Sequence, residues 1–311
     1  MKPLNIIFLG SPEFAVPSLE KIYHSPHHIK AVVSNPDKRR GRRGKPQPTK
    51  VKEKALELGL HVIDVDDLHS QKFQNQIAAL MPDLLVVVAF RILPSSILDI
   101  PKIGSINLHA SLLPKYRGAA PIHWAVINGE KETGCTIFFL NEKVDTGEII
   151  NQKKIEIGPM ETTGDVYNKL MLMGAVLLQE SIHKIAENNV EPIPQNHEQA
   201  TSAPKLFREN TKIDFHKSAQ EVHNLIRGLN PFPIAWCTFK GEKMNIYASK
   251  PVMEKQIPPG KLIYEDGKLF AGCGNGAVEI EELQLPGTKV MSGKEFANGY
   301  ETNRFLNESS S

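Results

Sequence analysis

Asn107 and His109 are the first residues whose types and spacing suggest chemistry. They lie two positions apart in the run GSINLHASLLPKYRG, which spans residues 104–118. Because side chains alternate between the two faces of a β-strand, both residues should point to the same face. An amide and an imidazole placed there can donate hydrogen bonds to the oxygen of a reacting carbonyl group. Acyl transfer requires this kind of stabilisation of developing negative charge.

Asp145, in the sequence KVDTGEII, is the candidate carboxylate for orienting or charging this imidazole. A nearby negative charge stabilises the imidazolium form of histidine. No serine or cysteine nucleophile lies in the 104–118 run with a base beside it, so direct attack by the acceptor's own amine is the simpler scheme. From spacing alone, Asn-x-His pairs also arise by chance, and Asp-Thr-Gly is also typical of an ordinary turn. Catalytic and purely structural interpretations are therefore both open at this point.

The elements that must position these residues alternate between strands and helices. Short apolar runs predict strands, and helical spacing of apolar residues predicts helices between and after them. The predicted strands are 4–9, 29–34, 61–65, 84–89, 104–109 and 136–140, and the predicted helices are 49–58, 69–80 and 163–186. Ser11-Pro12 predicts a further helix that begins with Ser11 as its cap. This order is typical of a doubly wound, mostly parallel α/β sheet, which binds ligands at the carboxyl ends of its strands.

The second half of the chain has a different pattern. We expect a first domain at residues 1–188, a polar, proline-containing linker at 189–204, and a second domain at 205–311. A helix at 218–228 precedes five short strands in the second domain. Hairpin turns are predicted at Gly241-Glu242, Asp266-Gly267 and Asn275-Gly276. Five short antiparallel strands predict a small barrel of the oligonucleotide-binding (OB) kind.

Positive charge is concentrated in one segment. Residues 38–54 carry nine basic residues and one acidic residue, a formal charge of +8, although the whole chain has a net charge of only +2. Glycines and prolines in this segment predict a loop over residues 39–48. A solvated charge run or a localisation signal is one interpretation. A loop that attracts a phosphate backbone to a nearby active site is the other.

Composition and missing motifs exclude several classes of protein. Hydrophobic residues make up 41% and charged residues 23%, as in soluble globular proteins, and no apolar run approaches the roughly 20 residues that span a bilayer. We therefore expect a cytoplasmic protein without a membrane segment. Three widely spaced cysteines predict neither disulfides nor a zinc site. The sequence lacks a dinucleotide-binding glycine loop, a P-loop and an H-E-x-x-H motif, so hydride transfer, ATP use and a metal cofactor are not expected.

The stretches SINLHASLLPKYRGAAPIHWAVINGE and TGCTIFFLNEKVDTGEII resemble the formyltransferase domain that uses 10-formyltetrahydrofolate. The elements Asn-x-His, Ser-Leu-Leu-Pro, Tyr-Arg-Gly-x-x-Pro and Asp-Thr-Gly occur in the family's order. The resemblance implies that Asn107, His109 and Asp145 are the catalytic residues. It also implies folate contacts at Ser111, Leu112, Leu113 and Pro114, and a pterin pocket around Phe90, Arg91, Ile92 and Leu93.

The second half, including ATSAPKLFRENTKIDFHKSAQEVHNLIRGLNPFPIAW, is similar to the C-terminal domain of the methionyl-tRNA formyltransferase family. The resemblance implies that the formyl acceptor is initiator methionyl-tRNA, that the basic loop at 36–54 contacts this tRNA, and that the protein is a monomer. The expected tRNA contacts are Arg42 above all, with Arg40, Arg43 and Lys45. A formyltransferase for an amino-sugar nucleotide, which should lack both the basic loop and this second domain, is the competing enzyme. A non-catalytic RNA-binding protein is the competing class.

Overall fold

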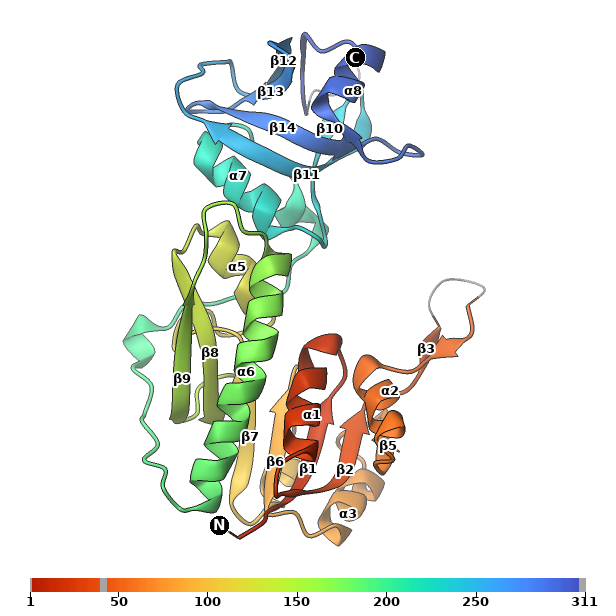
Figure 1. The fold of residues 1–311 in the computed structure, drawn as a ribbon, viewed down its shortest axis with the longest axis vertical. Helices are drawn as coiled ribbons and strands as arrows, with labels where there is room; N and C mark the ends of the chain where they lie inside the picture. The colour runs from red at the N-terminus through yellow and green to blue at the C-terminus, as the bar shows by residue number, and fades with distance from the viewer. Residues whose placement is uncertain (1, 40–43, 308–311) are drawn as a thin grey trace. The chain divides into compact units, whose positions relative to one another are not determined.

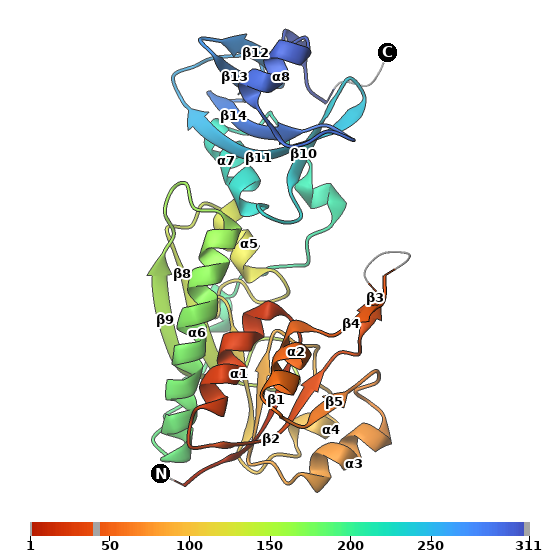
Figure 2. The same ribbon diagram turned by 45° about the vertical axis from the view of Figure 1, so that its right-hand side comes forward.

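The fold comes from a computed structural model, which describes residues 2–39 and 44–307. The chain forms two compact units (Figures 1 and 2). The first unit contains residues 1–118, 133–155 and 167–203, and the second contains 119–132, 156–166 and 204–311. Two internal segments thus group with the C-terminal part of the chain. The boundaries at 188 and 204 stay predictions. Among the described residues, no helix is long and apolar enough to cross a membrane.

The first unit is built on a seven-stranded sheet. Its strands are β1 (Asn5–Gly10), β2 (His28–Ser34), β5 (Val62–Asp64), β6 (Leu84–Val88), β7 (Gly104–His109), β8 (Glu132–Phe139) and β9 (Ile149–Glu156). Their order is β5-β2-β1-β6-β7-β8-β9. The first five strands pair in parallel, and β8 runs antiparallel to β7. The expected doubly wound, mostly parallel sheet is confirmed, and the chain reverses its direction of winding at β1.

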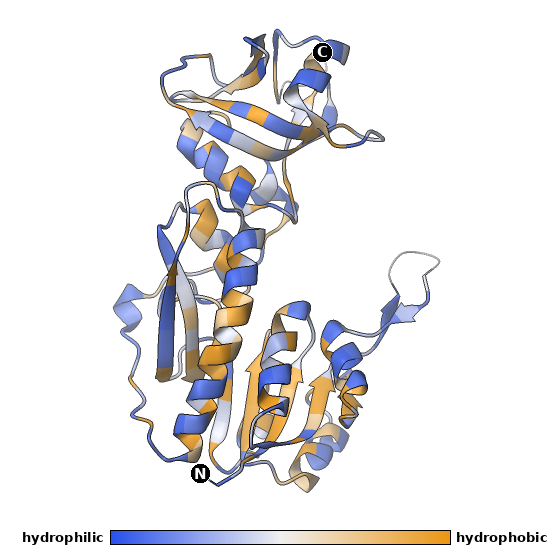
Figure 3. Ribbon diagram, viewed as in Figure 1, coloured by the Kyte–Doolittle hydropathy of each residue, from blue (hydrophilic) through white to orange (hydrophobic). Residues whose placement is uncertain are grey.

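Helices cover both faces of this sheet. The helical elements of the first unit are η1 (Glu13–Ala15), α1 (Val16–Tyr23), α2 (Lys50–Glu57), α3 (Gln71–Ala79), α4 (Ser95–Leu98) and η2 (His197–Gln199), together with most of α6 (Thr163–Ala186). Alternate residues of β1, such as Ile7 and Leu9, join an apolar core that includes Phe73 and Ile77 of α3. Figure 3 shows hydrophobic colour along β1, β2 and β6, the strands that helices cover on both faces. Continuous apolar strands are typical of this arrangement.

Helix α6 packs closely on the strands that carry the candidate site. A Cβ atom at Gly174 would lie 3.0 Å from the side chain of Leu108 in β7 and 3.1 Å from the Cys135 sulfur in β8. Glycine therefore lets the helix approach both strands at this point. The observed bounds of α6, Thr163–Ala186, are those predicted from its apolar spacing.

The predicted cap at Ser11 is wrong. A three-residue 3₁₀ turn begins at Glu13, and the Ser11 hydroxyl caps neither it nor α1. Instead the Ser11 Oγ atom accepts a hydrogen bond from the Asn35 backbone N–H at 3.2 Å and lies 3.3 Å from the Ser34 Oγ atom. This serine therefore joins the ends of β1 and β2, a role that local sequence rules do not describe.

The second unit contains a curled antiparallel sheet. Its strands are β10 (Ala235–Phe239), β11 (Glu242–Val252), β12 (Lys261–Glu265), β13 (Lys268–Gly272), β14 (Ala277–Gln284), β15 (Met291–Ser292) and β16 (Arg304–Phe305). Its helical elements are α5 (Pro121–Ile127), η3 (Arg208–Thr211), α7 (Ala219–Gly228) and α8 (Gly293–Gly299). The sheet order is β10-β11-β14-β13-β12-β16, with β15 beside β14. The small barrel-like domain is confirmed, and the two shortest strands, β15 and β16, were not predicted.

The two edges of this sheet meet at Asn307. Its backbone N–H donates to the Thr238 carbonyl oxygen at 2.8 Å, and its side-chain oxygen accepts from the Thr238 N–H at 3.0 Å. Thr238 belongs to β10, and Asn307 follows β16 at the opposite edge.

The first hairpin turn has its positive φ angles at Lys240 and Gly241, one position before the predicted pair. Asp266 and Gly267 form the second turn as predicted.

Candidate active site

The candidate site lies where two neighbouring parallel strands end. β6 ends at Val88, which is paired with Leu108, so residues 89–93 and 110–114 leave the sheet at the same edge. His109 is the last residue of β7 and is only 8% exposed, whereas Asn107 is half-buried. Among the described residues, no group forms a hydrogen bond with the Asn107 side-chain amide. That amide is therefore available to a bound group.

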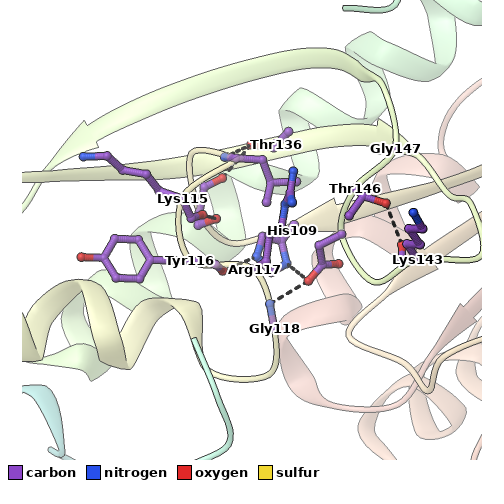
Figure 4. Close-up of polar contacts among 12 residues, drawn as sticks. His109, Lys115, Tyr116, Arg117, Gly118, Thr136, Lys143, Thr146 and Gly147 are labelled. Carbon is purple, nitrogen blue, oxygen red and sulfur yellow. Dashed lines mark hydrogen bonds and ion pairs between the residues drawn. The ribbon is translucent and has the colours of Figure 1, made fainter. Parts of the chain in front are cut away.

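The His109 ring is held by one strong contact. Its Nε2 atom lies 2.9 Å from the Tyr116 carbonyl oxygen (Figure 4). A carbonyl oxygen can only accept a hydrogen bond, so Nε2 carries the hydrogen. The other ring nitrogen, Nδ1, lies 3.7 Å from the Asp145 Oδ2 atom, which makes an ion pair when the imidazole is protonated. Nδ1 is thus the nitrogen left for a reacting group.

Asp145 reaches the histidine from the loop between β8 and β9. Its carboxylate is 13% exposed, and its Oδ2 atom accepts a hydrogen bond from the Gly118 N–H at 2.8 Å. Its φ angle is +53°, a left-handed conformation in which aspartate and asparagine are better tolerated than most residues. Two positions later, a Cβ atom on Gly147 would lie 1.6 Å from the Phe139 carbonyl oxygen. Glycine is therefore required for the loop to turn back against β8.

The Ser-Leu-Leu-Pro turn is held by Thr136 of β8. The Thr136 hydroxyl donates to the Ser111 carbonyl oxygen at 2.7 Å and accepts from the Leu113 N–H at 3.1 Å. The Ser111 hydroxyl donates to the Lys115 carbonyl oxygen at 2.7 Å. Ser111 and Leu113 are buried, while Leu112 and Pro114 are half-buried. The expected folate contacts therefore form a rigid turn beside His109, and their role stays a prediction.

The loop after β6 carries the residues expected around the pterin. Leu93 is buried, Phe90 is half-buried, and Ile92 is 72% exposed. The Arg91 guanidinium donates to the carbonyl oxygens of Asp66 and Val65, which hold this loop against the end of β5. The structure thus brings the 90–93 loop and the 111–114 turn to one edge of the sheet. Folate binding by the loop stays a prediction.

Three residues that the sequence analysis did not single out complete the surroundings of the pair. The Tyr116 carbonyl oxygen binds His109, the Gln195 amide binds the backbone around Asp145, and Thr201 binds the backbone at Tyr116. Gln195 and Thr201 lie in the polar segment expected to be an interdomain linker. The first unit includes that segment as far as Ala203. Because the segment has no periodic pattern, no local signal in the sequence pointed to these contacts.

The basic segment forms a short hairpin and the start of a helix. Strands β3 (Lys38–Arg39) and β4 (Pro46–Gln47) pair antiparallel and project from the sheet of the first unit in both views (Figures 1 and 2). Lys45 is exposed, whereas Arg40, Arg42 and Arg43 lie outside the described residues. Because β2 is parallel to β1, the hairpin follows β2 at the same edge of the sheet as the candidate site.

Part of the segment's charge is neutralised locally. Lys52 pairs with Asp37 at 2.6 Å and with Asp64 at 2.7 Å. Lys50 and Lys54 pair with acidic residues as well. The formal charge of +8 therefore overstates the positive charge that the segment offers to a ligand. Lys38, Arg39 and Lys45 of the hairpin, which lie in the described part of the chain, are exposed.

The second unit has a separate basic surface around Trp236. The charged groups of Arg208, Lys212 and Lys243 lie 5.1, 5.6 and 5.7 Å from the centre of the Trp236 ring. All three cationic residues are exposed. Aromatic rings surrounded by cations are typical of surfaces that bind single-stranded nucleic acid, since they combine stacking with phosphate attraction. This surface, which we call the Trp236 cluster, was not singled out from the sequence.

Cys135, which precedes Thr136 in β8, is a buried thiol. Burial raises the pKa of the Cys135 thiol in β8 to about 12, so this group stays protonated at neutral pH. Within the described parts of the chain, no group of three or more His, Cys, Asp or Glu side chains could hold a metal ion. The groups that contact the His109 ring are the Tyr116 carbonyl oxygen and the Asp145 carboxylate.

Comparisons with known proteins show the family of this chain. The family described as "Formyl transferase" matches residues 4–182, and "Formyl transferase, C-terminal domain" matches residues 205–301. A relative named methionyl-tRNA formyltransferase from Chlorobium limicola is 43% identical over 306 residues and covers 96% of both chains. The chain belongs to the methionyl-tRNA formyltransferase family. A second relative of that name, from Alkaliphilus oremlandii, is 43% identical over 98% of this chain and 100% of its own.

A solved structure shares the fold of this family member. It is the N-formyltransferase from Helicobacter canadensis, in complex with folinic acid and dTDP-3-aminofucose. The match has a TM-score of 0.69 and 24% identity, and it covers 89% of this chain and 98% of the other. At this identity the match concerns the fold alone. An enzyme with an amino-sugar nucleotide bound thus shares the architecture, so the fold alone does not identify the acceptor.

Proposed function

We propose that this enzyme transfers the formyl group of 10-formyltetrahydrofolate to the amino group of initiator methionyl-tRNA. The observation that carries the chemistry is the arrangement at the end of β7. There the Nδ1 atom of His109 lies 3.7 Å from the Asp145 carboxylate, beside the half-buried amide of Asn107. The names of the relatives support the acceptor. We further propose that the protein acts in the cytoplasm as a monomer.

Each residue of the trio has its own role in the proposed mechanism. The neutral amine of the methionyl group attacks the formyl carbon, a C–N bond forms, and the carbonyl oxygen becomes an oxyanion. Asn107 and His109 donate hydrogen bonds to that oxygen. Asp145 stabilises the charged imidazole and helps to remove the amine proton, directly or through water. The bond to N10 of the folate then breaks, and N10 takes up a proton as tetrahydrofolate leaves.

The folate would bind at the shared edge of β6 and β7. The rigid 111–114 turn and the 90–93 loop border this edge, and exposed Ile92 offers an apolar contact. No metal ion is required, because the formyl carbon of the donor is already activated by its aniline-like leaving group. The protein's main contribution is to align the two substrates and stabilise the oxyanion.

A formyl-transfer assay tests this function. The purified protein, 10-formyltetrahydrofolate and charged initiator methionyl-tRNA are expected to give formylated methionyl-tRNA, and kcat/KM should fall steeply as salt is raised. An amino-sugar nucleotide, glycinamide ribonucleotide and water are tested as alternative acceptors under the same conditions. Transfer to one of these and none to tRNA would overturn the acceptor. No transfer to any acceptor, with nucleic-acid binding retained, would favour a non-catalytic RNA-binding protein.

We expect Arg42 of the basic segment to contact the tRNA backbone. In Arg42→Ala, the apparent KM for tRNA should rise about fivefold to tenfold. The slope of log(1/KM) against log salt concentration should become shallower by about one, as expected for the loss of one phosphate contact. The apparent KM for the folate should stay unchanged. Lys50→Ala is the matched control, because it removes a positive charge that already pairs with Glu53 on α2. Equal effects of the two variants would mean that Arg42 acts only through net charge.

A further inference from the structure

The polar segment 195–203 contacts the Asp145 backbone directly and reaches His109 through Tyr116. We propose that this segment is a brace that holds the pair in its reactive geometry, with Gln195 and Thr201 as positioning residues for formyl transfer. The proposal rests on the proposed function, in which His109 and Asp145 act on the substrates. The brace itself need not touch either substrate.

Gln195 anchors the loop that carries Asp145. Its side chain is buried, with the residue 7% exposed, and every polar atom of the amide is used. The Nε2 atom donates to the Asp145 carbonyl oxygen at 3.1 Å and to the Gly147 carbonyl oxygen at 2.7 Å. The amide thus ties down the two ends of the turn in which Asp145 has its left-handed backbone conformation.

Arg117 fixes the orientation of that amide. The Gln195 Oε1 atom accepts from the Arg117 Nε at 3.2 Å and from a terminal guanidinium nitrogen at 2.6 Å. A guanidinium can only donate and a carbonyl can only accept, so the amide fits its four contacts in one orientation. Burial lowers the pKa of Arg117, and the nearby Asp145 charge opposes this shift. The guanidinium nevertheless stays charged at neutral pH.

Thr201 anchors the opposite side of the pair. Its hydroxyl accepts from the Tyr116 N–H at 2.9 Å, and its carbonyl oxygen accepts from the Arg117 N–H at 2.9 Å. The Ala203 N–H then donates to the Arg117 carbonyl oxygen at 2.7 Å. A Cβ atom at Gly118 would lie 2.7 Å from the Ala203 carbonyl oxygen, so the two segments of the chain are in close contact there.

This anchoring acts on both catalytic groups at once. Tyr116 supplies the carbonyl oxygen that holds the His109 ring, and Gly118 supplies the N–H that holds the Asp145 carboxylate. Thr201 binds the backbone on one side of these contacts, and Gln195 binds the Asp145 turn on the other. A displacement of about 1 Å in a reacting group can cost about a hundredfold in rate. The brace prevents such a displacement.

The first test is a double-mutant cycle in formyl transfer. Gln195→Met keeps the length of the side chain and removes all four hydrogen bonds, and we expect kcat to fall about tenfold to a hundredfold. The KM values for folate and tRNA should change by no more than about twofold, since binding is not the step affected. In an Asp145→Asn background, Gln195→Met should have little further effect, because it acts through Asp145. Full additivity of the two changes would overturn the positioning role.

The second test uses Thr201 and does not depend on the first. Thr201→Val keeps the shape and removes the hydroxyl, so kcat should fall about tenfold, whereas Thr201→Ser should restore it. Glu198→Gln, an exposed change in the same segment, is the control. Equal kcat in the Val and Ser variants would count against the brace. Thermal unfolding identifies any variant that does not fold. If Gln195→Met does not fold, the comparison of kcat between Thr201→Val and Thr201→Ser tests the proposal.

His109→Ala separates the two proposals. If that variant transfers formyl groups at the normal rate, the proposed function fails whatever the brace variants do. If it is inactive while Gln195→Met and Thr201→Val both retain the kcat of the unaltered enzyme, the brace alone is overturned.

Discussion

Replacing His109 with alanine is expected to lower kcat for formyl transfer by about a hundredfold to a thousandfold. That is the usual effect of removing one donor to an oxyanion. The ring is 8% exposed and is held by the Tyr116 carbonyl oxygen, so it reaches the reacting group from a fixed position. Apparent affinities for tRNA and folate should change little, because His109 acts mainly on the transition state. Steady-state kinetics with each substrate varied in turn measure both quantities.

Two controls accompany this variant. His69→Ala removes an exposed histidine elsewhere in the first unit and should have normal activity. Thermal unfolding of His109→Ala shows whether the variant still folds without the buried ring. A folded His109→Ala enzyme with nearly full kcat would contradict the assignment of this residue. Asn107→Ala, measured in the same way, should lose activity to a similar extent, since it removes the second proposed donor.

Replacing Asp145 with asparagine is expected to lower kcat by about a hundredfold or more, within the usual range for losing acid–base assistance. This change removes the negative charge and little else. An amide oxygen can still accept the hydrogen bond that the Gly118 N–H donates at 2.8 Å. Asparagine also tolerates the left-handed backbone at this position, where φ is +53°. The loss should therefore come from electrostatics rather than from misfolding.

The matched control for this variant is Glu148→Gln. It removes an exposed carboxylate from the same β8–β9 loop. Normal kcat in Glu148→Gln and reduced kcat in Asp145→Asn would show that the effect belongs to the carboxylate beside His109. If Asp145→Asn is as active as the unaltered enzyme, the charge is not used, and the acid–base role of Asp145 must be abandoned.

Local patterns were sufficient for most of the secondary structure. A short apolar run predicted a strand over 104–109, and β7 has these bounds. The helix at 163–186 was predicted at its observed bounds as well. The helix predicted at 218–228 is α7, which begins one residue later because Ser218 caps it with a reciprocal contact to Glu221. These features depend on residues that are close together in the sequence, so they can be predicted from a single sequence.

Predictions failed where a side chain is used by a distant segment. Ser11 has the residue type of a helix cap, but its hydroxyl binds the backbone of Asn35, 24 residues away. The basic residues of α2 counted toward a charge of +8, but Lys52 is neutralised by Asp37 and Asp64. A count of charges along the chain cannot show which carboxylates fold back onto them.

The sequence by itself determined the two kinds of domain, the strand that presents Asn107 and His109, and the resemblance from which Asp145 was assigned. Only the tertiary structure decided how these groups are held. The Tyr116 carbonyl oxygen sets the tautomer of His109, and Gln195 reaches the Asp145 backbone across 50 residues of chain. The physical reason is that such contacts depend on where a loop passes in space. In a polar segment without periodicity, the local sequence does not predict where the loop passes.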